Sequence, residues 1–291
     1  MDPGRFRAWR AVREAWSLIG GTKRVYVAMS VTVWAVGTLV RLALWVLLPE
    51  QGAPAGQAVD AGLIDLSFAF GLRVEVLGFE VSPGAPAVSG TQWSALAPAA
   101  AGLVTAVFGG AFAAYALRRA EGLPVWYGML LRYGRYAPSL VGLQLVAIGL
   151  GAALGYVLVA LLRPAADLLP STAWATALFA VPVVASIVFL DLALMFAGLY
   201  VVDRDLGPFA ALGRSVTLSF HNLGQTALLW LVALVAELAG SLTLGIASVW
   251  LAPLAAVAQG CAFRDAVGVH TAGEPLPLDA VPGRPALGEG A

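Results

Sequence analysis

Long apolar runs alternate along this chain with short polar segments that carry most of its arginine residues. A helix needs about 20 predominantly apolar residues to cross a bilayer. Six runs reach or approach that length: residues 25–48, 94–117, 137–162, 173–202, 224–241 and 243–263. The last two form one stretch that is too long for a single span, and Gly240 and Ser241 mark its turn. The pattern predicts an all-α polytopic membrane domain over residues 25–265, with six transmembrane helices in three hairpins.

The polar segment between the fourth and fifth spans, residues 203–224, predicts a short amphipathic helix at the membrane surface. Pro208 suits its first helical position, where the missing N–H costs nothing. Apolar side chains at spacings of three and four form one stripe: Phe209, Leu212, Val216 and Phe220. We expect the other side to face water or lipid headgroups; it carries Arg214, Thr217 and His221.

Two further polar segments, residues 1–24 and 123–136, have the same character, so each hairpin is predicted to follow a cytoplasmic interfacial helix. On the first, one face carries Trp9, Val12, Trp16 and Ile19, and the other carries Arg7, Arg10, Arg13, Glu14 and Ser17. On the second, Arg132 and Arg135 lie opposite a cluster of Trp126, Met129, Leu130 and Tyr133. Tryptophan and tyrosine favour the lipid interface, so we predict four anchors: Trp9, Trp16, Trp126 and Tyr133. The alternative for residues 1–24 is a surface helix packed on the protein's own body.

Two segments differ from the rest of the chain in pattern. Residues 64–76 alternate apolar and polar positions and are rich in aromatic and β-branched side chains, which is typical of strands. Because two or three strands bury too little surface to fold alone, we predict a small extracytoplasmic β-like cap over residues 50–93. Residues 266–291 form a tail rich in proline and glycine, without periodicity, for which disorder is expected.

Composition and charge agree with a membrane protein and give its orientation. Of the 291 residues, 60% are hydrophobic and 12% are charged. Most of the 17 basic residues precede the first span, follow the last, or lie between spans two and three or four and five. The positive-inside rule places that side, with both termini, in the cytoplasm. One cysteine and two histidines exclude an internal disulfide and make a cysteine or histidine metal site improbable.

Three charged residues fall inside predicted spans: Arg41, Asp191 and Glu237. At ~1.5 Å per residue, Arg41 and Glu237 both lie in the outer half of the membrane, whereas Asp191 lies nearer its middle. Charges in the membrane are expensive, so they indicate function or pairing. Three interpretations stay open: an Arg41–Glu237 pair, an arginine that extends to the outer surface, and a proton or ion pathway.

Small residues recur every fourth position on two spans. The second span carries Gly102, Ala106, Gly110 and Ala114, and the third carries Gly151 and Gly155. Such stripes let helix backbones approach closely. We expect them to pack helices within this chain, with homo-oligomer formation as the alternative.

No catalytic motif supports an enzyme. The sequence lacks GxxxxGK[ST], HExxH and GxSxG, and Asp203 and Asp205 are explained by pairing with Arg204. We therefore predict a non-catalytic accessory or scaffolding subunit without cofactor, metal or catalytic residues. Its partners would be the lipid bilayer and other integral membrane subunits, with no nucleic acid. The alternative is a transporter or channel for a small solute, ion or lipid; a membrane enzyme acting on lipid headgroups has the weakest support.

The segment after span four also carries a recognisable pattern, made by Asp203, Pro208, Ala211, Leu212, Ser215 and Asn222. It resembles a broad group of prokaryotic six-span proteins that includes the membrane domain of some glycerophosphodiester phosphodiesterases and several uncharacterised membrane families. Residues 11–21 are similar to the opening helix of that group. The resemblance implies a six-span fold in the cytoplasmic (inner) membrane of a prokaryote. It implies no activity, because the sequence has no counterpart of the soluble phosphodiesterase domain.

Overall fold

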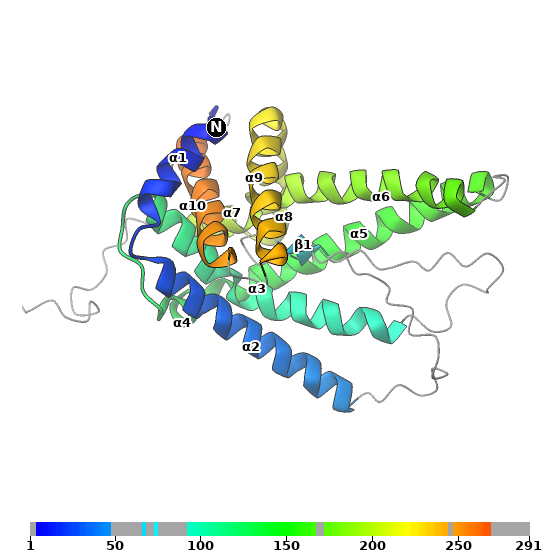
Figure 1. The fold of residues 1–291 in the computed structure, drawn as a ribbon, viewed down its shortest axis with the longest axis horizontal. Coiled ribbons are helices and arrows are strands. Elements are labelled where there is room, and N and C mark those ends of the chain that lie inside the picture. The colour runs from blue at the N-terminus through cyan, green and yellow to red at the C-terminus, as the bar shows by residue number, and fades with distance from the viewer. Residues whose placement is uncertain are drawn as a thin grey trace, which may run out of the picture.

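A computed structural model of the chain describes residues 4–47, 66–67, 73–74, 92–166, 172–243 and 247–268. Nearly all of these residues are helical (Figure 1), as the predicted all-α class requires. The elements in chain order are α1 (Ala8–Leu18), α2 (Lys23–Leu47), β1 (Leu66–Ser67), β2 (Arg73–Val74), α3 (Gln92–Ala120), α4 (Met129–Arg132), η1 (Tyr133–Tyr136), α5 (Ala137–Ala166), α6 (Thr172–Leu194), α7 (Ala197–Arg204), α8 (Pro208–His221), α9 (Leu223–Leu242) and α10 (Ser248–Val267).

Three helical stretches in the described part of the chain are long and apolar enough to cross a membrane: Met129–Leu162, Val181–Arg204 and Leu223–Gly240. They coincide with the third, fourth and fifth predicted spans. The first, second and sixth predicted spans correspond to α2, α3 and α10. These three are helices at the predicted places, and their crossing of a membrane stays a prediction.

Helices that follow one another in the chain pack in pairs: α2 against α3, α5 against α6, and α9 against α10. In Figure 1 the first two pairs spread toward one end of the molecule. The α9–α10 pair runs across them nearer the other end. The predicted spans therefore do not share one direction in this view, and their arrangement as three membrane hairpins stays a prediction.

The helix α10 lies in the main core, where it contacts α1, α3 and α9. Its residues 254–263 are all buried. Gly260 allows α3 to approach closely, because a Cβ at this position would collide with the backbone carbonyl of Ala116. Beside this contact the ring of Phe263 packs edge-on against Tyr200, with centroids 4.8 Å apart. The removal of these apolar groups from water stabilises the packing of α10 against its neighbours.

The prediction of one amphipathic helix over residues 123–136 is wrong. Gly122 has a φ of +72°, a left-handed conformation that ends α3 and reverses the chain. The segment that follows contains only the one-turn helix α4 and the short 3₁₀ helix η1. Gly128 and Gly134 lower the helix propensity of this stretch, and Met129 and Leu130 are buried. The segment thus packs as an irregular connection on the protein body.

The turn between the fifth and sixth predicted spans lies slightly later than predicted. The helix α9 continues through Gly240 and Ser241 to Leu242. The hydroxyl of Thr243 then donates to the carbonyl of Ala239 at 2.7 Å and accepts from the N–H of Ala247 at 2.9 Å. Through these two bonds the hydroxyl satisfies one backbone group on each side of the turn. Thr243, and not the predicted Gly240–Ser241 pair, therefore marks the end of α9.

The two strands form an antiparallel pair in which Leu66 faces Val74 and Ser67 faces Arg73. The strand β2 contacts α3, α5 and α6. The rest of the predicted cap over residues 50–93 lies outside the described residues. So does the tail from residue 269 onward, whereas residues 266 and 267, predicted as tail, belong to α10. The β-like cap therefore stays a prediction.

Candidate functional site

The fourth predicted span is not continuous, because a turn at Met195 and Phe196 divides it into α6 and α7. Ser215 of α8 lies at this break and is fully buried. Its hydroxyl accepts from the N–H of Phe196 at 3.1 Å and donates to the carbonyl of Ala193 at 2.6 Å. A buried backbone group without a partner is costly. The serine therefore satisfies a donor and an acceptor that the interrupted helix cannot pair itself.

The helix α8 begins at Pro208, as predicted, and buries one face that carries three small side chains and one leucine. Its buried positions are Ala211, Ser215, Leu218 and Ser219. The predicted apolar stripe lies largely on the other side, where Phe209 is 74% and Phe220 39% exposed. Leu212 is partly buried and packs on a second core cluster between α5 and α6. This helix thus packs on the body through one face, and of the predicted apolar stripe it leaves mainly Phe209 exposed.

Asp191 lies in the last turn of α6, directly before the break. Its side chain is 3% exposed, and its Oδ2 accepts from the indole N–H of Trp230 at 3.4 Å. Its Oδ1 is buried and has no hydrogen-bond partner within the described residues. Glu237 acts on Asp191 through its charge and follows Trp230 by seven residues, which places both on one face of α9. The structure therefore brings Asp191 and Glu237 into electrostatic range.

The predicted pairing of Arg41 with Glu237 cannot be followed, because the side chain of Arg41 lies outside the described part of the structure. The helix that carries Arg41, α2, packs on α3 and α10, whereas α9 packs on α1, α6, α8 and α10. The pairing stays a prediction.

Three arginines donate to carbonyl groups at the C-terminal ends of other helices; we call them the interhelical arginines, Arg119, Arg204 and Arg264. Arg119 donates to Leu18 at the end of α1, and Arg264 to Ala120 at the end of α3. Arg204 donates to Val267 and Gly268 at the end of α10, at 3.2 Å each. The last carbonyls of a helix lack helical partners and carry partial negative charge. Each arginine thus neutralises a helix end that packing has brought beside it.

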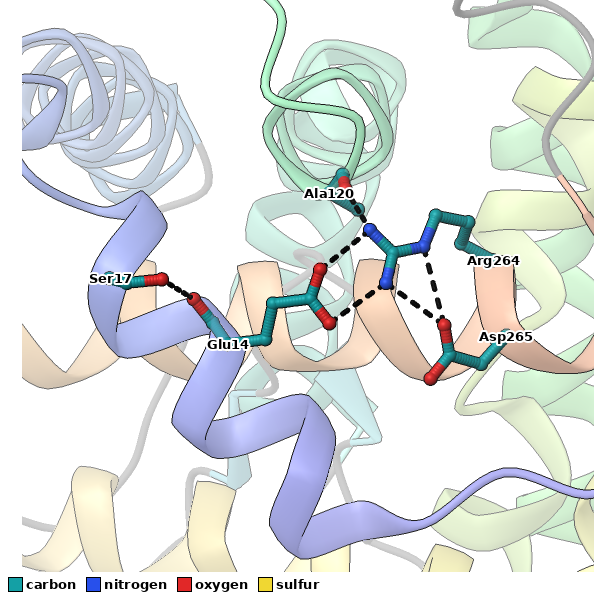
Figure 2. A network of polar contacts seen from close by, with 5 residues as sticks. All are labelled: Glu14, Ser17, Ala120, Arg264 and Asp265. Atoms are coloured by element: carbon teal, nitrogen blue, oxygen red, sulfur yellow. Dashed lines mark hydrogen bonds and ion pairs between the residues drawn. The ribbon is translucent and has the colours of Figure 1, made fainter.

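Arg264 also joins the first helix to the last, as Figure 2 shows. Its guanidinium binds both carboxylate oxygens of Glu14 in α1, at 2.8 and 2.9 Å, and Oδ1 of Asp265 at 2.9 Å. The hydrogen bond with Arg264 lowers the pKa of the Glu14 carboxyl below its ordinary value. The same bond raises the pKa of the Arg264 guanidinium. In the sequence Glu14 lies on the polar face of α1, and no pattern indicates that it pairs with Arg264.

The polar residues that follow the fourth predicted span have local structural roles. Asp203 is 1% exposed and forms an ion pair with Arg204 at 2.9 Å. Asp205 ends α7 in the left-handed region, with a φ of 52°, which aspartate tolerates better than most side chains. Asn222 follows α8 and donates to the carbonyl of Gly4 at 3.1 Å. The asparagine thereby ties the N-terminal segment to the corner between α8 and α9.

The helix α1 is attached to the body through one face. The side-chain oxygen of Gln225 accepts from the N–H of Ala8 at 2.9 Å and so caps the start of the helix. Ala8, Ala11 and Ala15 are fully buried, and α1 packs mainly on α10. Trp9 and Trp16 point away from this contact and are 63% and 62% exposed. The alanine face of α1 therefore packs on the protein body, as the alternative interpretation of residues 1–24 predicted. The two tryptophans on the opposite face remain accessible to lipid or to a partner.

The other two predicted lipid anchors contact protein groups. Trp126 is partly buried, and the guanidinium groups of Arg118 and Arg132 lie 5.1 and 5.9 Å from its ring centroid. Tyr133 stacks on Tyr136, with centroids 6.2 Å apart. Cation–π contacts of this kind stabilise a folded loop. These two aromatic residues therefore have a visible task in holding the connection between α3 and α5.

Part of each small-residue stripe lies at a contact inside this chain. Ala106, Gly110 and Ala114 are buried on α3, and a Cβ on Gly110 would lie 2.8 Å from the carbonyl oxygen of Tyr133. A Cβ on Gly151 would lie 3.8 Å from Leu190 of α6, and Gly155 is partly buried one turn further along α5. The surroundings of Gly102 lie outside the described residues.

Comparison with known proteins gives no family: no protein-family model, no curated protein and no solved structure matches the chain. Among the described residues, no group of three or more histidine, cysteine, aspartate or glutamate side chains is placed to hold a metal ion. The two features that stand out chemically are therefore the buried carboxylate beside the broken span and the exposed tryptophan face of α1.

Proposed function

We propose that the chain is a non-catalytic integral membrane protein, an accessory or scaffolding subunit of a larger membrane complex. In this proposal α2, α3, α5, α6–α7, α9 and α10 cross the cytoplasmic membrane of a prokaryote, both termini lie in the cytoplasm, and residues 50–93 cap the outer surface. The three apolar helical stretches and the position of the basic residues between the spans support this arrangement.

The observation that carries the proposal is the two-sided character of α1. Four groups far apart in the sequence fix its inner side: Gln225, Arg264, Arg119 and the alanine contact with α10. The outer side presents Trp9 and Trp16, the residue type that most often dominates binding at protein interfaces. A helix that is held rigidly by one face spends little entropy when it binds through the other. This favours a docking element over a moving part.

The test is purification of the tagged chain from gently solubilised native membranes, with identification of the proteins that stay bound. A matched pair of variants separates docking from general membrane contact. Trp9→Ala/Trp16→Ala should lose the partner, and Trp34→Ala, whose side chain on α2 is 71% exposed, should keep it. A wild-type chain that purifies alone, or as copies of itself only, would contradict the proposal.

A second candidate function is transport of a small solute or ion. It is favoured by the interruption of a span beside a buried carboxylate, because discontinuous helices line the binding sites of many transporters. Reconstitution of the purified chain in vesicles distinguishes the two functions. Ion or solute flux that the chain supports alone, and that Asp191→Asn abolishes, would favour transport.

A further inference from the structure

Three exposed arginines lie beside the exposed tryptophans of α1. Arg7, at the N-cap of this helix, Arg10 and Arg13 follow one another at spacings of three, so their side chains are neighbours on the helix surface. We call these three residues the arginine edge. Trp9 precedes Arg13 by four residues and Trp16 follows it by three, which places Arg13 between the two indoles. The outer side of α1 therefore presents basic and aromatic groups next to each other.

The arginine edge forms no ion pair with another residue in the described part of the chain. Glu14 is the only acidic residue of α1. It lies within electrostatic range of Arg10, but both of its carboxylate oxygens are bound by Arg264. Like charges at neighbouring positions of a helix repel each other. An anion beside the edge would therefore lower a repulsion that the described residues leave in place.

The chain holds the arginine edge close to the start of the first predicted span. Residues 19–22 alone separate α1 from Lys23, where α2 begins. A connection of this length spans less than about 20 Å. On its inner side α1 is fixed to α9 through Gln225 and to α10 through Arg264. In the arrangement proposed above, α1 therefore lies at the cytoplasmic surface of the bilayer, at the level of the lipid headgroups.

We propose that the arginine edge binds the headgroup phosphates of anionic phospholipids in the cytoplasmic leaflet. Guanidinium groups form paired hydrogen bonds with phosphate oxygens, and anionic lipids give this leaflet its negative surface potential. An acidic protein segment would fit the same charges, and the short connection between the edge and α2 favours lipid over it. The inference rests on the proposed membrane insertion of the chain. It adds a lipid to α1 beside the tryptophan contact proposed for the partner subunit.

The test uses the full chain, purified without a partner and reconstituted in vesicles of phosphatidylcholine with a minor fraction of phosphatidylglycerol. A variant that retains only Trp9 and Trp16 reports the lipids beside the arginine edge. Two vesicle series have the same lipid composition, and an equal amount of brominated lipid is phosphatidylglycerol in one and phosphatidylcholine in the other. We expect a quenching constant about fivefold larger for brominated phosphatidylglycerol, which is the effect of one arginine at an anionic surface.

Substitution of the whole edge, Arg7→Gln/Arg10→Gln/Arg13→Gln, should make the two quenching constants equal. The matched control is Arg214→Gln, which removes an exposed arginine of α8 and should leave the preference unchanged. A second measurement keeps all tryptophans of the chain, in case the reduced set does not fold. Phosphatidylglycerol added to the chain in detergent should raise the Tm more than phosphatidylcholine does, and the triple variant should lose this difference.

Equal quenching by both brominated lipids would overturn the inference, and so would a preference that survives the triple variant. Weak quenching by both would also overturn it, because protein and not lipid would then cover the edge. A variant that retains only Trp34, which is 71% exposed on α2, separates these failures from a failure of the membrane insertion. Both lipids should quench Trp34 alike. If neither lipid quenches it, the proposed insertion is itself contradicted, and the lipid contact with it.

Discussion

Glu14 and Arg264 form a two-pronged ion pair that joins the first helix of the chain to the last, 250 residues later. The same arginine donates to the carbonyl of Ala120, so one side chain connects α1, α3 and α10 (Figure 2). Such bidentate pairs combine geometric specificity with charge-assisted bonding. The position of α1, and therefore of its exposed tryptophans, depends on this contact.

The pair should make stability depend on pH in a defined direction. The pKa of Glu14 is lowered from 4.5 in the folded protein, so the unfolded chain binds the proton more readily. The stabilisation is thus complete above pH 4.5 and is lost as the pH falls through the lower, folded-state pKa. Below that window the Tm difference between wild type and Glu14→Gln should vanish. At neutral pH it should be about 2 °C, since a partly exposed pair contributes about 1 kcal/mol.

Thermal unfolding in detergent across this pH range measures the effect. Ser17→Ala is the control, because Ser17 lies on the same helix and its hydroxyl donates to the exposed backbone carbonyl of Glu14, not to its carboxylate. A constant difference between wild type and Glu14→Gln at all pH values would show that the carboxylate charge contributes nothing.

Ser215→Ala should lower the stability of the protein strongly, although the substitution removes only one hydroxyl group. It leaves the N–H of Phe196 and the carbonyl of Ala193 buried without the hydroxyl, at a cost of about 1–3 kcal/mol for each unsatisfied group. Thr217→Ala is the matched control on the same helix, because the Thr217 hydroxyl is exposed and donates to the backbone carbonyl of Gly213. Comparison of the two Tm values decides the point: a loss for Ser215→Ala as small as that of the control would mean that the helix break does not depend on the serine.

The tryptophans of α1 should lie at the membrane surface in the reconstituted protein. A variant that retains only Trp9 and Trp16 should be quenched strongly by lipids brominated near the headgroup end of the acyl chain. A variant that retains only Trp230, which is directed at Asp191, should be quenched much less. Equal, weak quenching of both variants would show that protein and not lipid covers the outer face of α1.

The sequence predicts where helices lie much better than how they end and meet. The six apolar runs coincide with helices, because the length and the periodicity of an apolar run are direct signals of a buried helix. The break at Met195 and Phe196 has no such signal, since neither residue disfavours a helix and the partner that stabilises the break, Ser215, lies on another helix. The segment with Trp126 and Tyr133 shows the opposite error: a plausible helical pattern is overridden by Gly122 and by packing on α3.

The candidate site was predictable only in part. Asp191 and Glu237 are visible in the sequence as charges inside spans, and depth alone favoured Glu237 with Arg41. The depth of a residue in the membrane does not determine which helices are neighbours. In the structure α6 packs on α9, and this places Glu237 within electrostatic range of Asp191.

The proposed function requires the six-span arrangement, and topology mapping tests that arrangement most directly. A short epitope or reporter placed after Arg24, after Arg119 and after Arg264 should be accessible only from the cytoplasm, and one inserted near Gln57 only from outside. The Gln57 position decides between the six-span map and its alternatives, because it requires α2 to cross the membrane. An external signal there is the result we predict, and a cytoplasmic signal would contradict the account.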